Sequence, residues 1–424
     1  MWLVPILAQT LSVAATDRAE VTALFERDST TAQASNTTSG LVGLAYDHAH
    51  WRLGLDYVPS LVLLVPFDDP ELVLLWTQAA SATVAVHGKH DEVGVRGSVI
   101  YGERDFRREL LVGSAPIAAD TEPPPAPGTG TAGTGTAGAG ATGGQAPVTP
   151  AEAQARAAAE PVRFGSVRGE AWYQHQFSRK VSFSALAGYG VARSFGGTAF
   201  AYPTTRSIDA VVSLANRLGR RDALATSLAG HRSSSRLGDR AYTLSLTEAL
   251  SHRFSARSNG LAGVGVAYNR EEPALGESTS SAYPLANVSF SHVRPSRKGV
   301  LSLTLHSAFA ATIDPISTGI DPRLTAGANV GWNDRRDYAL FAGVDTTRSL
   351  DPGGEGALQS FSGSLTASWF IGFGFVAETG LRGAWQTYAR AEVVPPTWSY
   401  FAALSWAGGV SSGHLFVRSA RRAR

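Results

Sequence analysis

Apolar and small polar residues alternate along almost the whole chain. Residues 361–369 show the pattern well: every second residue is apolar or glycine, and the residues between them are Ser362, Ser364, Thr366 and Ser368. A period of two is typical of β-strands, because successive side chains leave opposite faces of a sheet. The pattern therefore predicts strands with one face of large apolar side chains and one face of small polar or charged side chains.

The alternation predicts 18 strands, which are separated by segments rich in turn residues. They cover residues 19–28, 38–48, 51–63, 71–87, 92–103, 163–177, 181–193, 204–216, 222–233, 240–254, 258–270, 282–293, 299–312, 322–332, 337–348, 358–370, 372–388 and 397–406.

Eight short connections alternate with nine longer ones between these strands. Outer-membrane barrels show this asymmetry, with short periplasmic turns and longer outside loops, whereas a soluble sandwich gives no reason for it. No apolar run approaches the roughly 20 residues of a membrane helix, and without such a helix only a closed barrel can span a membrane. We therefore expect an all-β fold: a single transmembrane antiparallel β-barrel of about 18 strands in the bacterial outer membrane.

The barrel is expected to cover residues 19–406. Residues 1–15 are apolar and end in Val13-Ala14-Ala15, as a secretory signal peptide does, although the basic start is missing; a short buried strand is the alternative. Residues 104–161 include a Pro/Gly/Thr/Ala low-complexity stretch, which predicts a flexible extracellular loop within the barrel rather than an interdomain linker. Residues 407–424 are expected to form a basic tail that is solvated or contacts a periplasmic partner or lipid phosphate.

Charged residues within the predicted strands share the polar face, which is the inside of a membrane barrel. A charge on the lipid face costs a few kcal/mol at mid-membrane. One reading is a pore lining that selects solutes; the other is ion pairing inside the barrel that only stabilises it. Glu248 breaks the rule because it shares its face with leucines, so we expect a bulge there or a place near the membrane interface. The pore-lining candidates are Arg52, Asp56, Arg96, Arg168, Glu170, His306, Asp345, Glu378 and Arg382.

The composition limits the partners and the kinds of site that are expected. Charged residues make up 17% of the chain, against about 25% in soluble proteins, and the net charge of +2 gives no reason to expect a nucleic-acid partner. There is no cysteine, hence no disulfide or thiolate metal site. Four histidines at two neighbouring turns (His48, His50, His87 and His90) could bind zinc, but polar turn residues are the simpler reading. We find no catalytic motif, and expect no enzyme activity, no cofactor and no bound metal.

Three segments carry a resemblance to a known family. LDYVPSLVLL (residues 55–64), SVIYGERDF (98–106) and FGSVRGEAWYQHQFSRKVSFSALAGYGV (164–191) resemble the barrel subunits of bacterial exopolysaccharide export. More broadly, residues 19–406 resemble porin-type outer-membrane barrels in architecture. The resemblance implies a pore through which a growing polymer crosses the outer membrane beside a periplasmic export partner, without assigning a role to any single residue.

Several functions remain open at this point. The first is a pore for translocation of a secreted polysaccharide, because Ser, Thr, Gly and Asn on the inner face can exchange hydrogen bonds with sugar hydroxyls without holding one site tightly. The alternatives are a general diffusion porin for small polar solutes and a structural or adhesive surface barrel. The expected partners are outer-membrane lipid and lipopolysaccharide, the polysaccharide or small solute, and a periplasmic polysaccharide-export partner protein.

Overall fold

The computed structural model describes twelve stretches of the chain. They are residues 9–25, 30–48, 50–67, 72–104, 162–195, 204–236, 238–313, 320–334, 337–349, 359–388, 391–411 and 414–416. The expected loop between residues 104 and 162 and the end of the basic tail lie outside the described residues.

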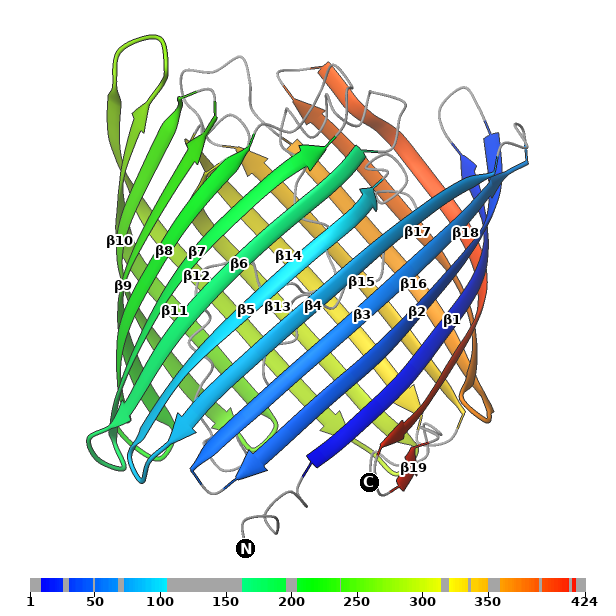
Figure 1. Ribbon diagram of the computed structural model, residues 1–424, viewed down its shortest axis with the longest axis horizontal. Coiled ribbons are helices and arrows are strands. Elements are labelled where there is room, and N and C mark those ends of the chain that lie inside the picture. Colours follow the sequence, from blue (N-terminus) through cyan, green and yellow to red (C-terminus); the bar gives the residue numbers. More distant parts are fainter. Residues whose placement is uncertain are drawn as a thin grey trace, which may run out of the picture.

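Eighteen long antiparallel strands form the molecule (Figure 1). The first nine are β1 (Gln9–Phe25), β2 (Thr30–His48), β3 (Trp51–Pro66), β4 (Val73–His87), β5 (Asp91–Arg104), β6 (Val162–Gln176), β7 (Val181–Phe195), β8 (Thr205–Asn216) and β9 (Asp222–Ser235). The next nine are β10 (Arg240–Ser255), β11 (Ser258–Glu272), β12 (Thr279–Pro295), β13 (Gly299–Ile313), β14 (Ile320–Asp334), β15 (Tyr338–Ser349), β16 (Gln359–Gly372), β17 (Phe375–Tyr388) and β18 (Ala391–Ser411).

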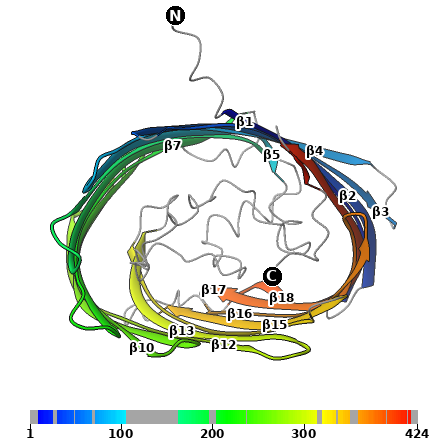
Figure 2. The ribbon, with the colours of Figure 1, turned by 90° about the horizontal axis from the view of Figure 1, so that it is seen from below.

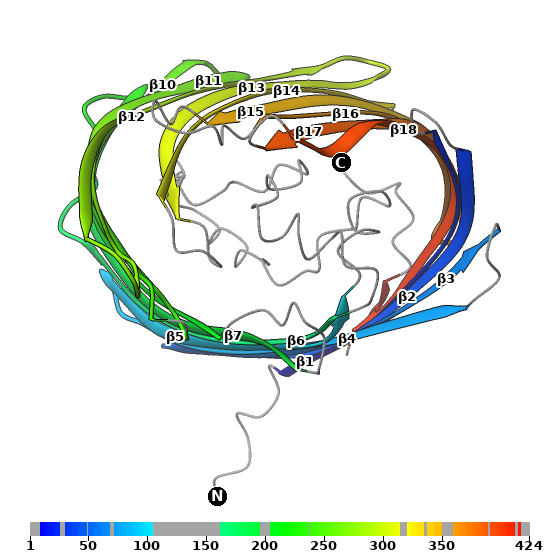
Figure 3. The same cartoon turned by 90° about the horizontal axis from the view of Figure 1, so that it is seen from above.

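The strands close into a ring, which Figures 2 and 3 show from its two ends. Each strand pairs with its neighbours in sequence, and β1 also pairs with β18, from Ser12 opposite Ser411 to Phe25 opposite Trp398. This contact is the seam at which the first and last long strands meet. A short strand β19 (His414–Phe416) pairs only with the end of β18. Closure leaves none of the eighteen strands with an unpaired edge, so the predicted all-β barrel is confirmed.

The two faces of the wall differ as the alternation predicts. Along β11, Val264, Val266 and Tyr268 point outward and are exposed, whereas Ala267 and Asn269 point inward and are buried. The same contrast runs through the other strands, where large apolar side chains make up the outer face. Among the described residues no helix is long and apolar enough to cross a membrane.

The connections differ between the two ends of the barrel. At the end where β1 begins, the turns contain two to five residues, such as residues 88–90 and 217–221. We call this the short-turn end, and the opposite end, which carries the 105–161 connection, the long-loop end. Two connections at the long-loop end are shorter than predicted, because β2 begins at Thr30 and β18 at Ala391. The polar stretch of residues 30–37 extends the wall, pairing with β1 up to Phe25 opposite Thr30.

Three expectations about single segments need revision. The wall begins at Gln9, so β1 includes residues 9–15 of the expected leader; cleavage there stays a prediction. β18 runs to Ser411, into the expected tail. Glu248 lies in the middle of β10 with regular pairing on both sides, opposite Thr226 and Val264. Neither a bulge nor a place near the strand end explains its outward position, and the expectation of either was wrong.

Candidate pore lining

Small hydroxyl side chains and glycines cover much of the inward face. On β16 every inward position from 362 to 368 is serine or threonine, and on β11 inward Gly263 and Gly265 alternate with outward valines. Small side chains leave room inside the ring and present hydroxyl and backbone groups to whatever occupies it. The inner wall is therefore suited to weak, repeated hydrogen bonding.

All nine candidates from the sequence lie on this inward face, since each has the opposite parity to exposed apolar neighbours on its strand. The structure divides seven of them among three parts of the wall. Arg96, Arg168 and Glu170 lie on β5 and β6, His306 and Asp345 lie on β13 and β15, and Glu378 and Arg382 lie on β17 near the seam. Asp56 approaches the inner surface of Gly43 on β2. Whether these side chains select a solute stays a prediction.

A chain of ion pairs crosses five strands, β5 to β9. Arg96 Nη2 lies 2.9 Å from Glu170 Oε2, and Arg168 Nε donates to Glu170 Oε1 at 2.7 Å. Arg168 also reaches Asp209 on β8 at 3.5 Å, and His231 on β9 contacts the same Asp209 carboxylate. Gly188 on β7 lies beneath this crossing, where a Cβ atom would be 3.7 Å from Arg168 Nη2. The charges alternate and compensate one another along the wall.

A second network spans the seam. Glu20 on β1 accepts hydrogen bonds from Arg18 Nε and Nη2 at 3.1 and 2.8 Å, and from Arg382 Nη1 at 3.2 Å. Arg18 also pairs with Glu378 on β17. The Arg382 guanidinium lies 3.8 Å from the centre of the Phe401 ring on β18. Only 2% of Glu20 is exposed, so this network links β1 to β17 across β18 around a buried carboxylate.

Sequence reasoning missed four members of these networks: Arg18, Glu20, Asp209 and His231. The predicted first strand began at residue 19, which left Arg18 outside it, although Arg18 and Glu20 share the inward parity of β1. Asp209 and His231 also alternate with outward apolar residues on β8 and β9, and that signal was present in the sequence. For Glu378 and Arg382, the network favours the stabilising reading over the selective one.

A third inward pair lies across a glycine. His306 Nε2 on β13 is 3.3 Å from Asp345 Oδ1 on β15, and Gly327 on the intervening strand β14 lies below both. A Cβ atom at Gly327 would be 2.1 Å from Asp345 Oδ1 and 2.4 Å from His306 Cε1. The absence of a side chain on β14 is what lets the two groups meet.

Positive charge gathers at the short-turn end. Four consecutive turns, from β6–β7 to β12–β13, carry a series of cations that we call the basic arc: Arg179, Lys180, Arg217, Arg220, Arg221, Arg253, Arg257, Arg294, Arg297 and Lys298. Within these described turns the only carboxylate is Asp222, which already contacts His252 at 2.6 Å. None of the arc residues forms an ion pair with a described carboxylate.

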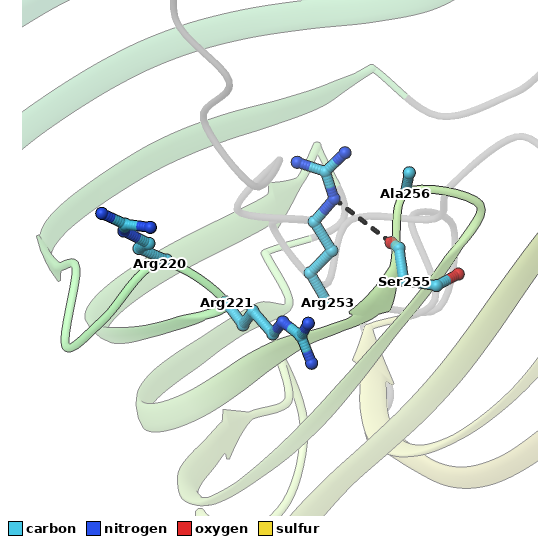
Figure 4. A pocket seen from close by; sticks show the side chains of 5 residues that line it. All are labelled: Arg220, Arg221, Arg253, Ser255 and Ala256. Atoms are coloured by element: carbon cyan, nitrogen blue, oxygen red, sulfur yellow. Dashed lines mark hydrogen bonds between the residues drawn. The ribbon is translucent and has the colours of Figure 1, made fainter.

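Two neighbouring turns of the basic arc enclose a hollow of 230 Å³, lined by Arg220, Arg221, Arg253, Ser255 and Ala256 (Figure 4). Arg253 Nε donates to the Ser255 carbonyl at 3.2 Å, which holds its guanidinium beside the turn. In the part of the chain that the structure describes, no three metal-ligating side chains come together. His87, one of the four turn histidines, contacts Glu92 at 3.2 Å.

A closed ring with an apolar outside, a polar inside and unequal ends defines an outer-membrane barrel pore of the porin type. The chain belongs to the EpsX exopolysaccharide export family, whose profile matches residues 103–409, from the end of β5 into β18. The resemblance drawn from the sequence and the outer-membrane location are thereby confirmed.

Solved structures that match the chain include outer-membrane proteins of two bacteria. OpdK of Pseudomonas aeruginosa matches with a TM-score of 0.46 and 7% identity over 94% of this chain and 99% of that one. OccK2 (OpdF) of Pseudomonas aeruginosa, solved in complex with glucuronate, has a TM-score of 0.45 and 8% identity over 94% and 97%. OccAB3 of Acinetobacter baumannii has a TM-score of 0.42 and 7% identity over 95% and 99%. No curated protein sequence matches the chain significantly.

Proposed function

We propose that this barrel translocates a secreted polysaccharide across the outer membrane. The observation that carries the proposal is the inner wall, which combines small hydroxyl side chains with networks of charges that are paired within the wall. Such a surface exchanges hydrogen bonds with sugar hydroxyls, and its paired charges hold a segment of a moving chain less tightly than isolated charges would. Membership of the EpsX family supports the same choice of cargo.

The proposal includes a periplasmic export partner at the short-turn mouth. Short turns face the periplasm in bacterial outer-membrane barrels, so the basic arc lies where such a partner would approach. Cations without carboxylate partners attract an acidic surface and raise the rate of encounter. The basic arc occupies four neighbouring turns, so it orients a partner toward one side of the mouth.

Export from cells tests the proposal directly. Deleting the gene should stop release of polysaccharide to the cell surface, and the full chain should restore it. A Ser289→Trp variant places a large ring on the inner face and should slow export, whereas Val288→Trp on the outer face should leave export unchanged. Both variants should insert into the outer membrane to the same level.

The competing function predicts a different result. If the barrel is a diffusion porin for small polar solutes, deletion should leave polysaccharide release intact and reduce uptake of a small sugar or amino acid. The Ser289→Trp variant would then lower solute flux in reconstituted vesicles without any change in surface polysaccharide. That combination would overturn the proposed export function.

A further inference from the structure

Six consecutive strands, β6 to β11, each carry an arginine on the outer face near the long-loop end. These residues, which we call the arginine belt, are Arg163, Arg193, Arg206, Arg232, Arg240 and Arg270. Each shares its parity with exposed apolar residues of its own strand, such as Val167 on β6 and Ile208 on β8. All six are exposed, so their guanidinium groups are available on the outside of the wall.

The belt stays near one height along the barrel. Arg163 pairs with Phe195, and Arg193 lies two residues further from the long-loop end than Phe195. Arg206 lies two residues further from that end than the position opposite Arg193 on β8, and Arg232 lies two residues further than the partner of Arg206. Arg240 lies two residues nearer to the long-loop end than the partner of Arg232, and Arg270 lies two residues further from that end than the partner of Arg240. Tilted strands require such a drift, because a level line around a barrel crosses successive strands at shifted positions. The register thus arranges the six side chains as a horizontal band.

Aromatic side chains mark the height of this band. The Arg193 guanidinium lies 4.0 Å from the centre of the Phe195 ring, and that of Arg232 lies 5.3 Å from the Tyr242 ring. Tyr101 on β5 contacts Phe195 at a ring separation of 5.6 Å. Outward aromatic rings collect at the level of the lipid headgroups. The belt therefore lies where headgroups are, and Val167, Ile208 and other apolar residues below it face the acyl chains.

The middle of the belt is uncompensated. At its two ends Arg163 pairs with Glu103 at 2.7 Å and Arg270 with Glu272 at 2.8 Å. Among the described residues, the four arginines between them have no ion pair. Elsewhere around the ring the outward positions near this end are mainly apolar, for example Leu74 on β4, Leu324 on β14 and Phe361 on β16, with Arg348 on β15 as an exception.

We propose that the arginine belt binds the phosphate groups of the phosphorylated glycolipid that forms the outer leaflet, lipopolysaccharide. A guanidinium matches a phosphate in charge and in the paired geometry of its N–H donors. The apolar wall beneath the belt would hold the acyl chains of the same molecule. That combination favours a lipid over a soluble anion, and the site is independent of what passes through the pore.

The test uses two variants with equal loss of charge. One replaces Arg193, Arg206, Arg232 and Arg240 by Gln, and the control replaces Arg179, Arg220, Arg257 and Arg297 of the basic arc by Gln. The amount of glycolipid retained per purified barrel is measured by native mass spectrometry. The wild type and the control should retain it, and the belt variant should retain at least about ten times less, as several lost charge-assisted contacts imply. Equal retention by the belt variant would overturn the proposal.

Thermal unfolding in detergent separates the possible ligands. Intact lipopolysaccharide should raise the unfolding temperature of the wild type and not that of the belt variant, because a ligand stabilises only the state that binds it. An equal rise with dephosphorylated glycolipid would show that acyl chains alone carry the binding. An equal rise with inorganic phosphate, or with an anionic polysaccharide, would show a site for soluble anions; each result contradicts the proposal. If the fourfold variant does not assemble, Arg206→Gln/Arg232→Gln takes its place in the same measurements.

Discussion

Single residues on the inner wall depend on neighbours that are remote in the sequence. The alternation around residues 372–388 was enough to predict that Glu378 and Arg382 point inward. Their partners Arg18 and Glu20 lie some 360 residues away and meet them only because the ring closes between β1 and β18. Local pattern carries no information on that closure. Gly380 has a similar role, since a Cβ atom there would be 2.7 Å from the Phe401 ring that supports Arg382.

Removing the buried carboxylate of this seam network should weaken the barrel. In Glu20→Ala, Arg18 and Arg382 lose their shared acceptor, and breaking a buried ion pair costs about 3–5 kcal/mol. We expect the variant to lose its folded mobility in SDS at a clearly lower temperature than the wild type. Glu248→Ala is the matched control: it removes an exposed outward carboxylate and should unfold at the wild-type temperature or above. If Glu20→Ala unfolds with the wild type, the network does not stabilise the seam.

At the scale of the strand, sequence alone was most informative. All eighteen predicted strands correspond to observed ones. Each strand has an apolar outer face and a more polar inner face, so the alternation of the two kinds of residue is visible in the sequence. The largest errors fall at β1, β2 and β18. Residues 9–15 of β1 were interpreted as a leader, and β2 and β18 continue into residues 30–37, 391–396 and 407–411, where the alternation of large apolar residues is lost. Hydrogen bonding to two neighbours extends these strands, and a pattern of apolar positions does not detect backbone pairing. Glu248 shows another limit. The sequence placed it correctly on the outer face, but the bulge expected at this residue is absent from the pairing of β10.

The two faces of one strand should respond in opposite ways to the same substitution. Val288 and Ser289 are adjacent in the middle of β12, and they point outward and inward. An arginine on the lipid face near the midplane costs about 2–4 kcal/mol, whereas an inward one stays in a polar environment. Val288→Arg should therefore reduce the folded fraction in outer membranes, and Ser289→Arg should not. Unequal effects in the reverse sense would mean that the register of β12 is shifted by one residue.

The whole molecule is asymmetric in charge around its axis. The basic arc lies at the short-turn end on β6 to β13, and the arginine belt lies at the long-loop end on β6 to β11, so both occupy the same side of the ring. The individual arginines were visible in the sequence, but their common height was not. Their height depends on how far the register shifts from strand to strand, and this shift is known only from the pairing of the strands in the closed barrel. The inner networks escaped prediction for the same reason.

The orientation of the barrel gives the last prediction. β5 ends at Arg104 and β6 begins at Val162, so both ends of the intervening segment are attached to the barrel at the long-loop end. Long loops lie outside the cell in bacterial barrels, and low-complexity segments tolerate insertions. An epitope inserted at Gly140 should bind antibody on intact cells, without loss of the folded barrel on an unheated gel. An epitope in the β8–β9 turn at Gly219 is the control and should bind only after the outer membrane is permeabilised. If the Gly219 epitope binds antibody on intact cells and the Gly140 epitope binds only after permeabilisation, the barrel has the opposite orientation. The arginine belt would then lie in the inner leaflet, which contains no lipopolysaccharide.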